Sequence, residues 1–188
     1  MKKNISCFIP RYKLLYKNII IKKLINIFKY KSCMQVPKLL KIVINRGFAK
    51  NYIINKKCLY IYKKELDLIS GQKSVLCYSK KDISNFKLRK NLPIGCKVTL
   101  RNNNMYNFLD KLINIILPRY KNFQGVNDIF DNKGNYNLGI KEQIIFPEIN
   151  INKIFNNLGM NISIVIKNKL VLESKKLLLL FGFPFKKI

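Results

Sequence analysis

Apolar residues recur along the chain with two periods, which together predict a mixture of helices and strands. Spacings of three and four predict helices over about 11–29, 51–70, 104–117 and 170–181. Alternation of apolar with polar residues predicts strands at 39–45, 74–78, 97–101, 138–145 and 162–167. This order predicts an α+β fold: a mostly antiparallel sheet with helices packed on one face. Neither an internal repeat nor a domain boundary is evident, so we expect one domain over 1–188.

Two predicted strands carry polar side chains on the face opposite their apolar residues. In 39–45, Leu40, Ile42 and Ile44 share the apolar face, and the other face holds Lys41, Val43 and Asn45. In 97–101 the polar face holds Lys97, Thr99 and Arg101. We therefore expect the sheet face without helices to be polar and basic.

Two polar stretches are predicted to be loops. The first, 79–92, gathers cations around Phe86, which either anchors the loop by packing or offers a ring on which a base can stack. The second, 119–137, is rich in Asn, Asp and Gly, and loops of this length are usually functional or disordered.

Net charge narrows the partners of the protein. The 188 residues include 37 Lys and Arg against 9 Asp and Glu, which gives a formal charge of +28. Such an excess repels itself in an isolated chain and attracts polyanions. Because acidic residues do not interleave with the bases, phosphates are the expected counter-charge and a nucleic acid the expected partner.

The composition argues against an enzyme. The chain has no histidine, which removes the usual general base, every Ser-His or Cys-His nucleophile and the commonest zinc ligand. The five cysteines form no CxxC pair, so we interpret them as reduced thiols, with a four-cysteine zinc site as a minor alternative. We expect no catalytic residues, no metal site and no cofactor.

A membrane-bound role is the alternative from another class. Segment 11–31 is basic and amphipathic, as an interfacial helix or a transit peptide would be, although no stretch reaches the roughly 18 apolar residues that span a bilayer. The alternative hypothesis is therefore a basic peripheral membrane protein that uses this helix. We favour the nucleic-acid partner and expect neither membrane binding nor a homo-oligomer.

Several long strings resemble one protein family over about residues 10–186. The family is the bacterial-type large-subunit ribosomal protein five, which binds 5S rRNA in the central protuberance. The strings are MQVPKLLKIVIN (34–45), ISGQK (69–73), FKLR (86–89), PIGCKVTLR (93–101), MYNFLDKLINIILPR (105–119), GNYNLGIKEQIIFPEI (134–149) and FGFPF (181–185).

The resemblance implies a concave sheet face that meets 5S rRNA, with further contacts to large-subunit rRNA, P-site tRNA and a protein of the small-subunit head. Carried over by position, the rRNA candidates are Lys41, Asn45, Arg46, Gln72, Lys73, Lys97, Thr99 and Arg101. The tRNA candidates are Lys80, Lys81, Phe86, Lys87 and Arg89. The candidates that face the small subunit are Arg119, Lys121, Lys133 and Asn135.

Three positions depart from the family pattern. Arg46 stands where the family usually has Met, and we interpret it as an additional phosphate contact. Asp82 replaces a usual Ser, and Asn85 replaces a Gly, which narrows the backbone freedom of the loop. The abundance of Lys, Asn and Ile is typical of an A/T-rich genome, as in many organelles and some endosymbionts. We predict an organellar ribosome, and the nearly unaltered bacterial strings favour a plastid over a mitochondrion.

Overall fold

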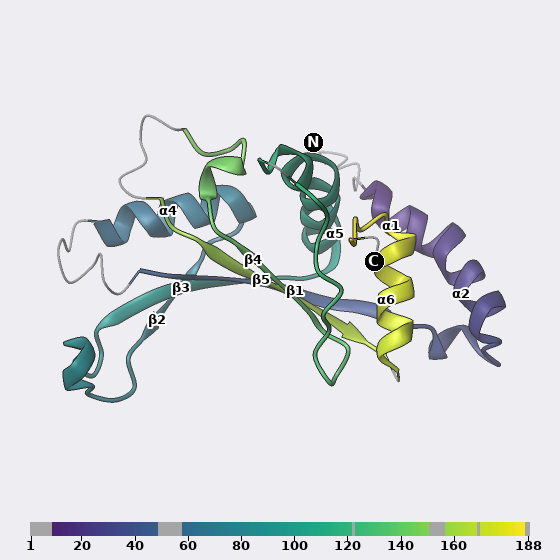
Figure 1. The fold of residues 1–188 in the computed structure, drawn as a ribbon, viewed down its shortest axis with the longest axis horizontal. Helices are drawn as coiled ribbons and strands as arrows, with labels where there is room; N and C mark the ends of the chain where they lie inside the picture. Colours follow the sequence, from purple (N-terminus) through teal and green to yellow (C-terminus); the bar gives the residue numbers. More distant parts are fainter. Residues whose placement is uncertain (1–8, 49–57, 122, 151–156, 169, 187–188) are drawn as a thin grey trace, which may run out of the picture. The chain divides into compact units, whose positions relative to one another are not determined.

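Five strands form one sheet in the order β2-β3-β1-β5-β4, and helices accompany it, which confirms the predicted α+β fold (Figure 1). The computed structural model describes residues 9–48, 58–121, 123–150, 157–168 and 170–186. The strands are β1 (Lys38–Gly47), β2 (Val75–Tyr78), β3 (Pro93–Leu100), β4 (Tyr136–Ile140) and β5 (Met160–Lys167). The pairs β1–β3, β2–β3 and β4–β5 are antiparallel.

The contacts divide the chain into two compact units, each assembled from separate segments. Unit 1 comprises Met1–Leu40, Arg101–Gly134 and Ile166–Ile188, and unit 2 comprises Lys41–Leu100 and Asn135–Val165. Nearly all of the sheet belongs to unit 2, and most of the helices belong to unit 1. The single-domain organisation of the whole chain stays a prediction.

In unit 2, helix α4 (Cys58–Ser70) lies along one face of the sheet (Figure 1). Tyr62, Leu66 and Ile69 recur at helical spacing and are fully buried. On the strands, Ile44 of β1 and Val98 of β3 are paired in the ladder and are also buried. Burial of these apolar side chains between helix and sheet is what holds α4 in place. The predicted start of this helix, 51–57, lies outside the described residues.

In unit 1, the N-terminal helix is continuous from residue 11 to residue 28, as predicted. It consists of α1 (Arg11–Leu15), a π-helical turn (Tyr16–Ile20) and α2 (Ile21–Phe28). It packs against α5 (Asn102–Lys111), which continues through a second π-helical turn and a 3₁₀ turn to Arg119. The last helix, α6 (Val171–Leu180), ends where Gly182 adopts a φ of 86°.

The structure corrects three local predictions. The apolar spacing over 11–29 predicts that Leu14 lies on the buried stripe of the first helix, but Leu14 is exposed, and the buried residues are Tyr12, Ile20 and Leu24. Helix α5 starts at residue 102 and not at residue 104, where the predicted helix 104–117 begins. The strand predicted over 138–145 is β4, which starts at residue 136 and ends at residue 140, because the chain then turns into a 3₁₀ segment (Gln143–Ile145).

Candidate nucleic-acid interface

The sheet face opposite α4, which we call the open face, carries the polar residues that the alternation predicted. Burial along β1 alternates so that Ile42 and Ile44 are buried while Asn45 is exposed. In the β1–β3 ladder, Asn45 pairs with Lys97 and Val43 pairs with Thr99, so these side chains share the open face. The pattern brings together four of the rRNA candidates, namely Lys41, Asn45, Lys97 and Thr99.

Strands β5 and β4 extend the open face with further amides and hydroxyls. Asn137 pairs with Ser163, and Gly139 pairs with Asn161, while the intervening residues Ile162 and Ile164 are fully buried. Sequence reasoning did not single out these positions as contacts, and only Ser163 lies within the predicted strand 162–167. Among the described residues of β1 to β5, the open face holds no acidic side chain.

Arg46 is not part of this face, which corrects the prediction that it contacts a phosphate. Its side chain shares the buried face with Ile42 and Ile44 and is 0% exposed. Its Nη1 lies 2.8 Å from Oε2 of Glu65 on α4, and its Nη2 donates to Oε1 of Gln143. A guanidinium paired in the interior has no access to RNA, so we remove Arg46 from the candidate contacts.

Burial and the charge of Arg46 shift the pKa of Glu65 in opposite directions. Desolvation raises the pKa of its carboxyl, and the charge of Arg46 opposes that rise without cancelling it. The ionic contact is close but poorly directed, because among the described residues neither oxygen of Glu65 accepts an aligned hydrogen bond. This buried group therefore serves packing between α4 and the sheet.

The remaining rRNA candidates lie at the margins of the strands. Gln72 and Lys73 are exposed in the link between α4 and β2, and the side-chain amide of Gln72 donates to the carbonyl oxygen of Thr99 at 3.4 Å. Arg101 is exposed and directly follows β3, where unit 1 resumes. Gln72 is thus tied to the end of β3 and lies beside Thr99.

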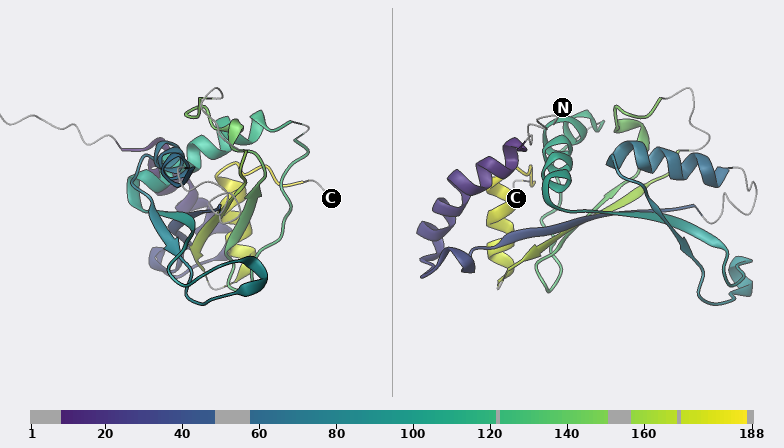
Figure 2. Two further views of the ribbon diagram at one scale, coloured as in Figure 1. Left: turned by 90° about the vertical axis from the view of Figure 1, so that its left-hand side faces the viewer. Right: turned by 180° about the vertical axis from the view of Figure 1, so that it is seen from behind.

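The predicted basic loop, 79–92, joins β2 to β3 and curves away from the sheet on the side opposite α4 (Figure 2). A bridge between Ile83 and Leu88 closes its tip around a 3₁₀ turn (Ser84–Phe86). The ring of Phe86 is 67% exposed, which favours the stacking interpretation over the packing one. All five tRNA candidates are exposed: Lys80, Lys81, Phe86, Lys87 and Arg89.

The two departures in this loop have structural explanations. A carboxylate oxygen of Asp82 accepts a hydrogen bond from the backbone N–H of Lys90 at 2.7 Å, so it fastens one side of the loop to the other. Lys87 and Asn91 have left-handed backbone conformations, with φ angles of 52° and 66°, whereas Asn85 does not. A glycine at position 85 is therefore not needed for this turn.

Contacts within unit 1 hold the middle of the segment predicted to be a long loop, 119–137. Val126 exchanges backbone hydrogen bonds of 2.9 Å with Pro184 and Lys186, and Lys175 forms an ion pair with Asp128. Of the small-subunit candidates, Arg119, Lys121 and Lys133 are exposed in unit 1, whereas Asn135 is half-buried and belongs to unit 2.

A metal site, a reactive thiol or a membrane-spanning helix would each require particular features of the described residues. They contain no group of three or more Cys, Asp or Glu that is arranged to hold a metal ion. Burial raises the pKa of the Cys96 thiol to about 11, so this thiol stays protonated at neutral pH. None of the helices in the described ranges is long and apolar enough to cross a bilayer.

The N-terminal helix also bears on the membrane alternative. Its aromatic side is used inside unit 1, where Tyr12 stacks on Phe181 at 5.7 Å between ring centroids and Tyr16 lies 6.4 Å from Tyr106. Burial raises the pKa of Tyr16 to about 12. Tyr12 and Tyr16, which an interfacial helix would insert into a membrane surface, therefore pack instead against α5 and against Phe181 at the end of α6.

Two family models match this chain over most of its length. One is described as ribosomal protein L5 and covers residues 32–89, and the other is described as the C-terminus of the same ribosomal family and covers residues 93–185.

Relatives match over nearly the whole chain. The large ribosomal subunit protein uL5 of Karelsulcia muelleri is 57% identical over 180 residues, which is 95% of this chain and 96% of the relative. The protein of the same name in Acholeplasma laidlawii is 52% identical over 177 residues, 94% of this chain and 98% of the relative. The protein uL5c of Pleurastrum terricola is 51% identical over 179 residues, 95% of this chain and 96% of the relative.

Proposed function

Because this chain belongs to the ribosomal protein L5 family of structural, non-enzymatic large-subunit proteins, we propose that its open face binds 5S rRNA in the central protuberance. The observation that carries the proposal is the open face itself. It presents Lys41 and Lys97 with the amide of Asn45 and the hydroxyl of Thr99, and it has no acid among the described strand residues. The lysines neutralise phosphates, and the amide and hydroxyl groups read a folded RNA surface.

We propose further contacts for the two loops. The basic loop 79–92 approaches P-site tRNA, where the four candidate cations Lys80, Lys81, Lys87 and Arg89 meet phosphates and the exposed ring of Phe86 stacks on a base or ribose. The stretch with Arg119, Lys121 and Lys133, together with Asn135, faces a protein of the small-subunit head. Large-subunit rRNA is the remaining partner, and Gln72, Lys73 and Arg101 contribute to the rRNA contacts.

Binding of the purified chain to transcribed 5S rRNA at several salt concentrations tests the central claim. We expect log K to fall linearly with log salt, with a slope of about −0.7 to −0.9 for each phosphate neutralised. Lys41→Gln with Lys97→Gln should reduce that slope by about 1 to 2. Lys64→Gln is the matched control, because Lys64 is an exposed lysine on α4. A flat salt dependence, or an equal effect of the control, contradicts the proposal.

For the compartment, we propose an organellar ribosome, with a plastid placed before a mitochondrion. The proposal rests on the A/T-rich composition and on the similarity to the uL5c protein of Pleurastrum terricola. Sequencing the DNA on both sides of the gene tests it, and a bacterial chromosome there would overturn it.

A further inference from the structure

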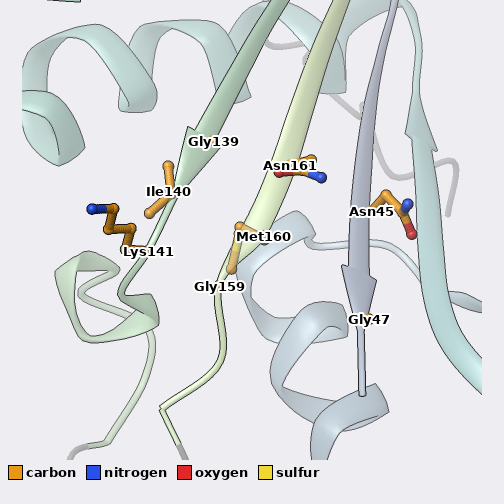
Figure 3. A pocket seen from close by; sticks show the side chains of 8 residues that line it. All are labelled: Asn45, Gly47, Gly139, Ile140, Lys141, Gly159, Met160 and Asn161. Atoms are coloured by element: carbon orange, nitrogen blue, oxygen red, sulfur yellow. The ribbon is translucent and has the colours of Figure 1, made fainter. Parts of the chain in front are cut away.

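A hollow of about 410 Å³ opens at the end of β1, β5 and β4 (Figure 3). Such a volume lies at the small end of the roughly 300–1,000 Å³ of ligand sites, so it suits one nucleotide and not a duplex. All eight of its lining residues belong to unit 2: Asn45, Gly47, Gly139, Ile140, Lys141, Gly159, Met160 and Asn161.

Two glycines keep this hollow open without being required by the backbone. Neither Gly47 nor Gly139 has a positive φ. A Cβ atom on Gly47 would meet nothing within 4 Å, and one on Gly139 would lie in ordinary contact, 3.6 Å from Oδ1 of Asn161. Gly159 differs, because its Cβ would come within 2.9 Å of the carbonyl oxygen of Ile140. Side chains at positions 47 and 139 would therefore fit the fold but would occupy the hollow.

The polar groups of the hollow are free to bind a ligand. Asn45 and Asn161 stand on the neighbouring strands β1 and β5 and are exposed (Figure 3). Within the described part of the chain, neither side-chain amide takes part in a hydrogen bond, whether on this face or elsewhere. Lys141 supplies the charge of the lining, which includes no acid.

We propose that the hollow receives one unpaired nucleobase of 5S rRNA, a subsite that rests on the proposed function of the open face. An asparagine amide can donate to N1 of an unpaired adenine while its oxygen accepts from the N6 amino group, so both groups of the Watson–Crick edge are bound at once. This uses the same donor and acceptor pairing with which asparagine recognises N6 and N7 of a paired adenine. Unpaired bases that leave their stack are the usual targets of sequence-specific RNA recognition. The glycines let the base approach the strand backbone, and Lys141 meets the phosphate of the same nucleotide.

The test uses the full chain, transcribed 5S rRNA and two variants that leave its net charge unchanged. Gly139→Leu fills the hollow, and Asn161→Ala removes one amide. We expect each to weaken binding about tenfold or more, the scale of one lost base contact, with an unchanged salt slope. Asn107→Ala, which removes an exposed amide of α5, is the matched control and should bind like wild type.

Dimethyl sulfate probing of the bound RNA gives a second readout. We expect the Watson–Crick edge of one adenine to be protected by the wild-type chain and to become reactive with Asn161→Ala. If Gly139→Leu lowers the melting temperature of the free chain, its weaker binding could come from misfolding. The affinity and the footprint of Asn161→Ala then decide whether the subsite exists. Wild-type affinity and an unchanged footprint for Asn161→Ala would overturn the subsite and leave the proposed function intact. Failure of the wild-type chain to prefer 5S rRNA over a competitor RNA would instead overturn the proposed function.

Discussion

Replacing Arg46 by Met tests the buried contact between β1 and α4. Arg46 is 0% exposed and Glu65 is 7% exposed, so solvent screens their interaction little. Arg46→Met removes the cation and leaves the carboxyl group of Glu65 in the interior. Breaking a buried pair from one side costs about 3–5 kcal/mol, and we expect the free energy of unfolding to fall by that amount. Glu65→Leu alone should cost about as much, since it strands the guanidinium.

The double variant Arg46→Met/Glu65→Leu should recover part of this loss. Apolar side chains of similar volume can replace a buried ion pair at little cost, and the contact here is poorly directed. What remains is the hydrogen bond that Gln143 loses, about 1–3 kcal/mol. Urea unfolding of the four proteins, analysed as a double-mutant cycle, measures the coupling. Two single variants that each cost less than about 1 kcal/mol would refute this account of the pair.

The loss of stability in the single variant Arg46→Met should depend on pH. In wild type, burial already raises the pKa of Glu65 and Arg46 counteracts the rise, so loss of Arg46 should raise this pKa further. For an acid whose pKa is raised by folding, the proton-linked stability is present below the unfolded pKa and is lost as pH rises through the folded value. The deficit of Arg46→Met should therefore be smaller at pH 5 than at pH 8. A deficit that grows on acidification would show that the carboxyl group is not buried.

Two further predictions concern the basic loop and the cysteines. Neutralising Lys80, Lys81 and Lys87 with Gln should leave 5S rRNA affinity within about threefold while slowing translation by reconstituted ribosomes, because these cations lie in the loop and not on the sheet; a large loss of 5S affinity would place the loop on that RNA. At pH 7.5 iodoacetamide should modify the exposed Cys33 much faster than Cys96, whose thiol is buried with a pKa of about 11; equal rates, measured by peptide mass spectrometry, would contradict this environment.

The alternation of apolar and polar residues was enough to predict the open face, but not which charged residues near it are buried. Lys41, Asn45, Lys97 and Thr99 fall where a period of two places them. The same period puts Arg46 beside the buried residues 42 and 44, yet its charge suggested an RNA contact. The deciding partner, Glu65, is on a helix, and a pattern within one strand carries no information about which residue packs across from it.

The hollow was beyond reach of the sequence for a different reason. It depends on two glycines and two asparagines that come from β1, β4 and β5, and the strand order is what makes those strands neighbours. Helix limits were missed by smaller margins, as at residues 102 and 104, because local capping preferences compete with tertiary packing.

The two units consist of different segments of the chain, so one unit is fully synthesised before the other. Every segment of unit 2 has been made once residue 165 is added, whereas unit 1 also needs Ile166–Ile188. The backbone hydrogen bonds of Val126 can form only after Pro184 and Lys186 have been synthesised. A nascent chain that stalls soon after residue 167 can hold all five strands of the sheet while unit 1 still lacks α6, and the apolar side chains that α6 would cover are then exposed to chaperones.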